Sequence, residues 1–184
     1  MPDWNVDADS GWVSDARRAL SPNHDQRPPD TEIDVLVIHA ISLPPSQFGD
    51  DFITQFFTNC LDCNIHPYFK EIEELRVSSH FLIDRTGALT QFVSTCDRAW
   101  HAGLSRFQGR EQVNDFSIGV ELEGCDELPF EDAQYESLAQ LTSILMNSYP
   151  KIAKSNIVGH SDISPGRKTD PGPYFNWDRF RALL

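Results

Sequence analysis

The residues best suited to chemistry lie between positions 157 and 171, where a histidine, a lysine and an aspartate follow a short apolar run. Ile157-Val158-Gly159 is followed by His160, then by the turn-forming Ser164-Pro165-Gly166, and then by Lys168-Thr169-Asp170. Residues two apart in an extended segment point to the same side, so the lysine and the aspartate are expected to face one way. The turn could fold them back beside the histidine. An imidazole and a carboxylate suit a metal ion, and an ammonium suits an oxyanion that forms next to it.

A second candidate ligand, His39, follows the strongly apolar run Ile33-Asp34-Val35-Leu36-Val37-Ile38. This β-branched run predicts a strand over 33–39 that ends at the histidine, where functional side chains are common. With His160 and Asp170 it makes three ligands and leaves one coordination position open, which is typical of catalytic rather than structural zinc. Spacing alone does not make the two histidines neighbours.

Glu121 is the candidate general base. It lies in Ser117-Ile118-Gly119-Val120-Glu121-Leu122-Glu123, where apolar residues alternate with Gly119, Glu121 and Glu123. The small Gly119 beside it would leave room for a substrate. The alternative is that Glu121 and Glu123 form a solvated strand face, and Lys168 could equally be an ordinary surface lysine.

The other metal-binding residue types favour structural interpretations. His24 lies in a polar segment and His66 precedes a proline, so both are expected to be structural or exposed. Cys60-Leu61-Asp62-Cys63 has the spacing of a zinc or redox pair, but no second pair follows at zinc-ribbon spacing. We interpret these cysteines as structural or incidental.

Hydrophobic periodicity predicts the elements that position these residues. Strands are expected at 33–39, 79–83, 89–93 and 117–123, with a strand end at 157–159, and helices at about 48–59, 67–75, 131–148 and 177–184. Residues 100–115 are expected to form a polar loop. This interleaving predicts an α/β (α+β) fold, with a mixed central sheet flanked by helices in a single domain spanning 1–184. Residues 1–32, rich in Asp, Pro and Ser, are expected to be an arm that packs on it.

Composition limits the partners. The 184 residues carry a net charge of −13, which argues against nucleic acid or an anionic membrane but not against a small anionic substrate. No run approaches the roughly 18 apolar residues of a membrane span, and the acidic first residues do not resemble a secretory signal. We therefore expect a soluble, cytoplasmic protein, a monomer, whose four cysteines are reduced.

Several ordered motifs resemble those of the zinc amidases that cleave the amide between the lactyl group of N-acetylmuramic acid and L-alanine. The resemblance extends from about residue 11 to the last helix, and is greatest to the cytosolic, AmpD-type branch that acts on 1,6-anhydro-muropeptides. Its motifs are Val37-Ile38-His39, 41–45, 75–80, 98–103, 114–124 and 157–173. Several long motifs in one order are far more specific than any one of them.

The resemblance implies the fold shared with peptidoglycan recognition proteins. It implies one Zn²⁺ per chain, with His39, His160 and Asp170 as the ligands. It makes Glu121 the base that takes a proton from the attacking water, and Lys168 the group that stabilises the tetrahedral oxyanion. The implied activity is hydrolysis of small anhydro-muropeptides in peptidoglycan recycling, and hence control of β-lactamase induction.

The same resemblance places Arg76 and Trp100 at sugar or peptide contacts, whereas His80 and His101 are not ligands. The chain also departs from the pattern of the family. Ala40 stands where Asn is usual, Gln112 stands where a basic residue is common, and Cys125 replaces an expected Thr. The first two changes could each remove a hydrogen bond to the substrate.

Three other functions fit parts of the sequence. His160-Ser161-Asp162 is the His-x-Asp of a non-haem iron oxygenase, but that site needs a second histidine downstream and none follows. A muropeptide-binding module on the same fold would be catalytically weak, and a complete ligand set with Glu121 and Lys168 argues against it. A periplasmic amidase would need an export signal, and the acidic first residues do not resemble one.

Overall fold

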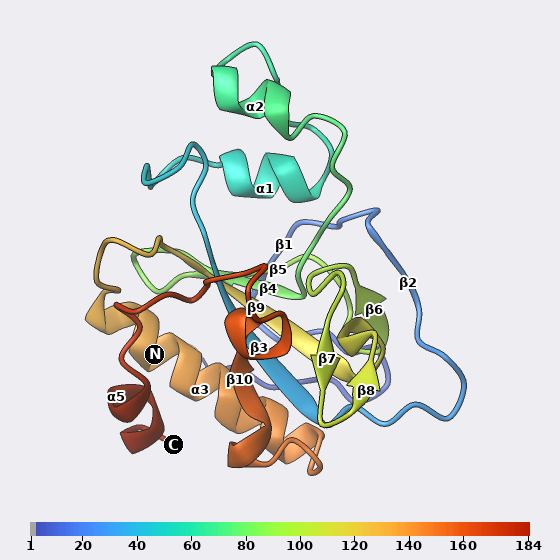
Figure 1. Cartoon of the computed structure of the whole chain (residues 1–184). Coiled ribbons are helices and arrows are strands. Elements are labelled where there is room, and N and C mark those ends of the chain that lie inside the picture. Colours follow the sequence, from blue (N-terminus) through green and yellow to red (C-terminus); the bar gives the residue numbers. More distant parts are fainter. Residues whose placement is uncertain (1–2) are drawn as a thin grey trace.

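A mixed sheet of six strands runs through the centre of the molecule (Figure 1). The computed structural model describes residues 3–184, so the first two residues of the predicted arm lie outside the described part. In spatial order the strands are β1 (Arg17–Arg18), β5 (Leu89–Gln91), β4 (Phe81–Ile83), β9 (Ser117–Glu123), β3 (Val35–Ile41) and β10 (Ile157–Gly159). Neighbouring strands are parallel except for the β4–β5 hairpin, which is antiparallel. The predicted mixed sheet and its hairpin are confirmed.

Helices flank this sheet, as predicted. They are α1 (Phe52–Phe57), α2 (Pro67–Glu71), α3 (Asp132–Ser148), α4 (His160–Ile163) and α5 (Trp177–Ala182), with 3₁₀ turns at Val113–Phe116 and Lys154–Asn156. Helix α3 matches its prediction, whereas α1, α2 and α5 are shorter than expected. In Figure 1, α1 and α2 stand beyond one end of the strands, while α3 and α5 lie together beside the sheet. Two small antiparallel pairs join β2 (His24–Gln26) to β6 (Asp97–Ala99), and β7 (Arg106–Phe107) to β8 (Arg110–Glu111).

Of the two strand ends predicted at the candidate ligands, the one before His160 is confirmed, because β10 ends at Gly159, and the one at His39 is wrong. The strand predicted over 33–39 continues to Ile41, so His39 lies within β3 rather than at its end. The added residues pair with Leu122 and Glu123 of β9, and this pairing outweighs the local sequence signal. His160 opens the short helix α4, which hydrophobic periodicity cannot detect in four residues.

One face of the sheet forms the main core with α3. Buried apolar side chains on this face and on the helix are Leu36, Ile38, Ile118, Val120, Leu122, Leu138, Leu141 and Leu145. Helix α3 begins with a capping box between Glu131 and Gln134, which satisfies two of its free amides. Burying each leucine side chain stabilises the fold by about 1.5–3 kcal/mol. This face anchors the sheet and leaves the opposite face available for the site.

The opposite face of β9 is also buried, and the solvated-face alternative for its glutamates is therefore wrong. Glu121 is 8% exposed and Glu123 is 4% exposed, because loops and α4 cover this side. Glu123 accepts hydrogen bonds from the amides of Gly49 and Arg85, at 2.7 and 3.1 Å. It ties two loops to the sheet.

The N-terminal arm contributes to the sheet through β1 and to the core through Trp4, Val6 and Val13. The guanidinium of Arg27, in the same arm, also points into the protein. This group donates to the carbonyls of four residues, Thr95, Asn114, Asp115 and Ser117, at 2.8–3.4 Å. Burial lowers the pKa of Arg27 to about 10, so it remains a cation at neutral pH. Among the described residues, no helix is both long and apolar enough to cross a membrane.

Arg27→Met should lower the free energy of unfolding by about 3 kcal/mol, because each buried carbonyl left without a hydrogen bond costs about 1–3 kcal/mol. Urea denaturation would measure it. Arg17→Met is the matched control: Arg17 pairs with Asp51 on the surface, and loss of such a pair costs at most about 1 kcal/mol. Equal losses in the two variants would contradict this role of Arg27.

Candidate metal centre

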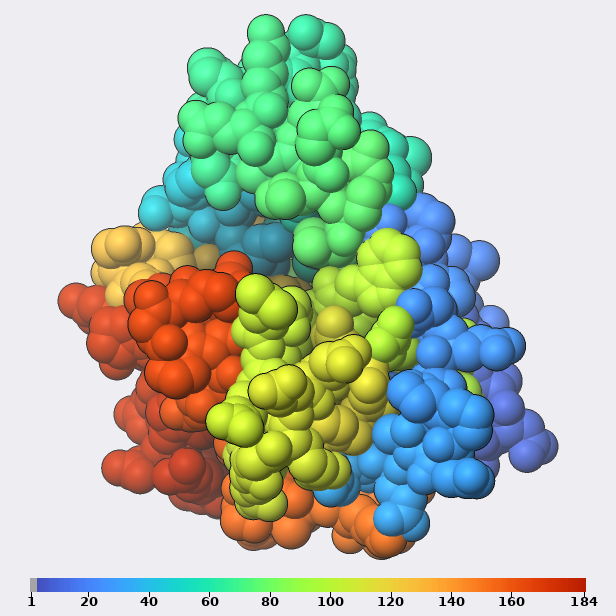
Figure 2. Space-filling model, turned by 45° about the vertical axis from the view of Figure 1, so that its right-hand side comes forward, coloured from blue at the N-terminus to red at the C-terminus, as the bar shows by residue number. Residues whose placement is uncertain are grey.

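His39 and Glu121 lie side by side on neighbouring parallel strands. In the β3–β9 register His39 is the partner of Glu121 and Val37 is the partner of Gly119, so all four point to one face of the sheet. Both His39 and Glu121 line a cavity of about 510 Å³. Figure 2 shows the recess between the green segment around α2, the yellow-green segment after residue 100 and the orange-red segment near residue 168. The strand register therefore delivers an imidazole and a carboxylate to one cavity.

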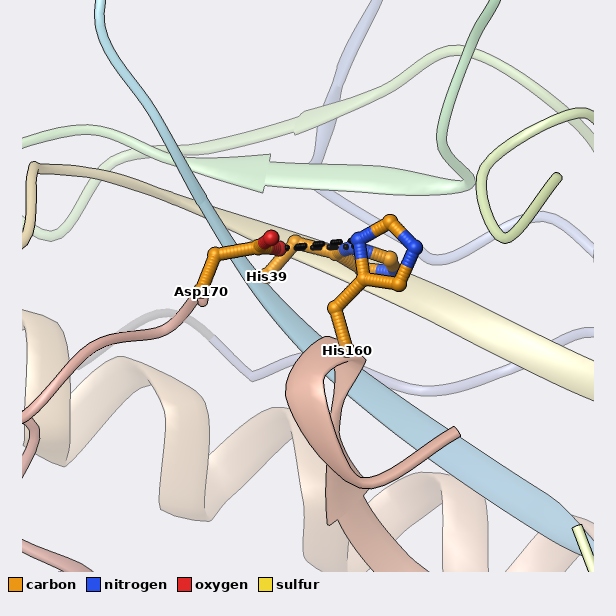
Figure 3. A group of neighbouring side chains, drawn as sticks. All are labelled: His39, His160 and Asp170. Carbon is orange, nitrogen blue, oxygen red and sulfur yellow. Dashed lines mark hydrogen bonds and ion pairs between the residues drawn. The ribbon is translucent and has the colours of Figure 1, made fainter. Parts of the chain in front are cut away.

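Three side chains from distant parts of the chain converge in this cavity (Figure 3). Nδ1 of His39 lies 3.0 Å from Nδ1 of His160 and 3.2 Å from Oδ2 of Asp170. Nδ1 of His160 lies 3.0 Å from the same carboxylate oxygen. The sequence left open whether the histidines are neighbours, and the structure brings them together.

Local backbone geometry places Asp170 beside His160. Gly159 has no Cβ, and a Cβ there would lie 2.8 Å from Cδ of Pro171, so only glycine lets the returning segment pack this closely. The amide of Ser161 donates to the carbonyl of Asp170 at 2.9 Å. The predicted turn at 164–166 thus folds the chain back as expected, and these contacts fix the result.

The donor set calls for a cation. Nε2 of His160 lies 3.1 Å from the carbonyl of Ala102, which can only accept, and 3.4 Å from the guanidinium of Arg167, which can only donate. The shorter contact places a proton on Nε2, which leaves Nδ1 as the nitrogen that presents a lone pair. That lone pair faces the carboxylate of Asp170 and the Nδ1 of His39. Burial lowers the pKa of His39 to about 4, so its ring is neutral at pH 7. Burial would raise the pKa of Asp170, but its close contacts with His160 and His39 hold it below its usual value.

Glu121 is the other buried acid of the cavity. Within the described residues, its Oε2 has no hydrogen-bond partner. Burial raises the pKa of Glu121 well above its usual value, the nearby Asp170 adds to this, and Lys168 opposes it. An unpaired, desolvated carboxylate in a cavity is costly and is typical of a functional group.

The space beside Gly119 is not available to a substrate, and that sequence interpretation is wrong. A Cβ on Gly119 would lie 2.5 Å from Cγ of His101, so the missing side chain makes room for this imidazole. His101 is 8% exposed, and its Nδ1 lies 2.9 Å from Nε2 of His39. Because His101 comes from a different segment, the alternation of residues along β9 could not reveal what fills the space.

Lys168 and Asp162 occupy different surroundings. Lys168 is exposed and lines the same cavity as the three converging side chains. Asp162 accepts a hydrogen bond from the amide of Gly159 at 2.7 Å and lies outside the converging group. The His-x-Asp alternative therefore has no support in the geometry.

The two residues predicted to contact substrate lie beyond the cavity wall. Arg76 is exposed and donates to the carbonyls of Glu73 and Leu75, beside a smaller cavity of about 190 Å³. Trp100 is half-buried, and its amide donates to Ser78. The three residues that depart from the family pattern lie in two places. Ala40 and Cys125 line the main cavity, whereas Gln112 lies beside a neighbouring depression.

Tyr68 and Arg167 are among the residues of the cavity wall that the sequence did not indicate. Tyr68 precedes the buried Phe69 in α2, and periodicity indicated only the inward side of that helix. Arg167 lies within the 157–173 motif, which indicates no role for it. It donates to the carbonyls of Ala102 and Leu104 at 2.6 and 2.8 Å, which ties the segment after α4 to the loop that follows Trp100.

Comparison with known proteins agrees with this geometry. Residues 29–173 match the N-acetylmuramoyl-L-alanine amidase family. The chain is 58% identical over 178 residues to the 1,6-anhydro-N-acetylmuramyl-L-alanine amidase AmpD of Haemophilus influenzae, covering 97% of each chain. It superposes on a crystal structure of an AmpD derivative with a TM-score of 0.93 and 55% identity, covering 95% of this chain and 97% of that one.

A more distant structure was determined with a ligand. It is AmiD, an N-acetylmuramyl-L-alanine amidase from Escherichia coli, in complex with the substrate anhydro-N-acetylmuramic acid-L-Ala-D-gamma-Glu-L-Lys. The TM-score is 0.63 at 30% identity, and the match covers 94% of this chain and 63% of that one. Taken with the nearly full-length matches and the converging histidines and aspartate, this establishes that the chain belongs to the N-acetylmuramoyl-L-alanine amidase family.

Proposed function

We propose that this chain hydrolyses the amide bond between the lactyl group of 1,6-anhydro-N-acetylmuramic acid and L-alanine in muropeptides. The single observation that carries the proposal is the convergence of His39, His160 and Asp170 in a cavity that also holds the unpaired carboxylate of Glu121. The AmpD relatives, which match over nearly the whole chain, carry this activity in their names. The reaction is a step of peptidoglycan recycling, through which it controls β-lactamase induction.

The ion that fits the three donors is Zn²⁺. Tetrahedral zinc has bonds of about 2.0–2.2 Å to imidazole nitrogen and carboxylate oxygen, so its ligand atoms lie about 3.3 Å apart. The three separations here are 3.0, 3.0 and 3.2 Å. Two imidazoles and one carboxylate leave a fourth position for chemistry. When bound, zinc supplies Lewis acidity that polarises the amide carbonyl and acidifies water.

Glu121 and Lys168 handle the proton and the developing charge. The carboxylate of Glu121 takes a proton from water as the water oxygen bonds to the lactyl carbonyl carbon, and gives that proton to the L-alanine nitrogen as the C–N bond breaks. Its raised pKa brings the acid closer to neutral pH, where both transfers are possible. The ammonium of Lys168 offsets the negative charge that develops on the carbonyl oxygen.

The substrate occupies the cavity of about 510 Å³, with Arg76 and Trp100 beyond its wall. Anhydro-muropeptides are small enough for such a site, and the AmiD complex carries a ligand of this class. For Arg76 and Trp100 to contact the substrate, its sugar or peptide must extend past the cavity. The monomeric state and cytoplasmic location stay predictions from the sequence.

A binding module without catalysis is the less favoured function. Such a module gains nothing from a buried carboxylate that lacks a partner, because burying it costs stability. Glu121 instead has the raised pKa expected of a general base. Hydrolysis accounts for both features.

Asp170→Ala should lose its zinc and its activity, because one of three ligands is removed. Asp162→Ala, the matched control eight residues earlier, should keep the metal, because Asp162 bonds to the amide of Gly159 and lies outside the converging group. Metal analysis of the purified variants and mass spectrometry of an anhydro-muropeptide before and after incubation would measure both. The reverse pattern would refute the ligand set.

Glu121→Gln should keep one zinc per chain and lower the rate of hydrolysis by at least about 100-fold, because the proton acceptor is lost. The same metal analysis, paired with initial rates, tests it. Loss of zinc from this variant would mean that Glu121 is a ligand rather than the base.

The carboxylate of Glu121 should also make the metal-free protein pH-sensitive. Its folded pKa lies above the unfolded value of 4.5, so below pH 4.5 both states are protonated and its ionisation has no effect. As pH rises above 4.5 the unfolded state ionises first, which lowers stability until pH passes the folded pKa. Urea denaturation in the presence of a chelator at pH 5 and pH 8 would test this. The free energy of unfolding of Glu121→Gln, relative to that of the wild type, should be higher at pH 8 than at pH 5. A constant difference would argue against the raised pKa.

A further inference from the structure

Each imidazole of the metal centre has partners for the nitrogen that points away from the other ligands, and the nearest partner of each belongs to one two-residue segment. Nε2 of His39 lies 2.9 Å from Nδ1 of His101. Nε2 of His160 lies 3.1 Å from the carbonyl oxygen of Ala102. The guanidinium of Arg167 makes a longer contact with Nε2 of His160, at 3.4 Å. His101 and Ala102 are buried, at 8% and 0% exposure. His101 and Ala102, which are adjacent in the chain, therefore contact the Nε2 atoms of both histidine ligands.

The segment His101–Ala102 is itself held on several sides. Oδ1 of Asn114 accepts hydrogen bonds from the backbone amides of both residues, at 3.2 and 2.8 Å. The ring of His101 stands perpendicular to that of His39 (87°), in the space that Gly119 leaves open. Its Nε2 lies 3.1 Å from Oγ of the fully buried Ser117. The ring is thus constrained on both of its nitrogens and on its face.

One assignment of protons satisfies all of these contacts when a metal is bound through Nδ1 of His39. The ring of His39 then carries its proton on Nε2 and donates it to Nδ1 of His101. His101 must in turn carry its own proton on Nε2, where it donates to Oγ of Ser117. Each nitrogen then has one role, and no ring needs to be charged.

We propose that His101 is a positioning residue that acts through His39, and that His101–Ala102, clamped by Asn114, orients both imidazole ligands of the metal. The proposal rests on the metal site of the proposed function. Groups that accept the outer N–H of a ligating histidine fix its tautomer and ring orientation and raise its basicity. Here one acceptor is a neutral imidazole rather than the usual carboxylate or carbonyl. A side chain can be replaced, so its contribution can be measured separately from that of the backbone.

Two amide replacements separate the two nitrogens of His101. The Oδ1 of Asn reaches about as far as Nδ1 of His, so His101→Asn retains an acceptor for His39. The longer Gln places its amide near Nε2, so His101→Gln retains the contact with Ser117 and loses the acceptor. His101→Gln should bind Zn²⁺ about 10- to 100-fold more weakly than wild type, and His101→Asn less than about 10-fold more weakly.

Zinc affinity is measured by competition with a chromophoric chelator, which does not depend on activity. His24→Gln is the matched control, because the same change at a surface histidine outside the site should leave the affinity unchanged. Loading with Co²⁺ adds a readout of ligand geometry: the visible absorption of the Gln variant should shift, and that of the Asn variant should resemble wild type. At saturating zinc, the Gln variant should lose kcat with little change in KM.

A measurement on the wild type keeps the proposal testable if a variant does not fold. Two-bond ¹H–¹⁵N correlation spectra of the histidine-labelled, zinc-loaded protein report the tautomer of each ring. His101 should be protonated at Nε2 and not at Nδ1. The opposite tautomer would overturn the proposal.

The outcomes separate this inference from the proposed function. The proposal would fail if His101→Gln bound zinc as tightly as the wild type, or if His101→Gln and His101→Asn lost equal zinc affinity. Either result would mean that His101 contributes only packing. If wild type binds zinc normally in that experiment, the proposed function survives. A wild type that binds no zinc would overturn the proposed function, and this inference with it.

Discussion

The close approach of three electron-pair donors is the interaction on which the rest of the structure depends. Two imidazole nitrogens and one carboxylate oxygen lie 3.0–3.2 Å apart, and both imidazoles are buried. Such a group repels itself unless a cation lies at its centre. Contacts outside the group hold its members in place: the strand register for His39, the carbonyl of Ala102 for His160, and the glycine–proline contact for Asp170.

The sheet divides stability and chemistry between its two faces. One face of β3 and β9 packs leucine and isoleucine side chains against α3, and this burial stabilises the strands. The other face carries the polar side chains, covered by loops from several parts of the chain. A shift of either strand by one residue would turn its side chains over and place His39 or Glu121 in the apolar core. The apolar face thereby holds the reactive residues in alignment.

Burial affects the polar groups near the site in different ways. It raises the pKa of Glu121, lowers that of His39 to about 4, and lowers that of Arg27 to about 10. Arg27 compensates with hydrogen bonds to four carbonyls, whereas Glu121 has an oxygen without a partner within the described chain. Fully satisfied groups stabilise the fold, and an unsatisfied acid is retained where chemistry needs a proton acceptor. The distinction separates structural from reactive polar groups in this protein.

The strands around His39 and Glu121, the leucine stripe of α3 and the candidate ligands could be predicted from the sequence, because they depend on short-range periodicity and on motifs that resemble a known family. Three features required the folded chain: His39 lies within β3, both faces of β9 are buried, and His101 fills the space beside Gly119. Periodicity shows which side chains share a face but not which distant segment covers that face. The cover here comes from loops, and their positions follow from packing across the whole chain rather than from their own residues.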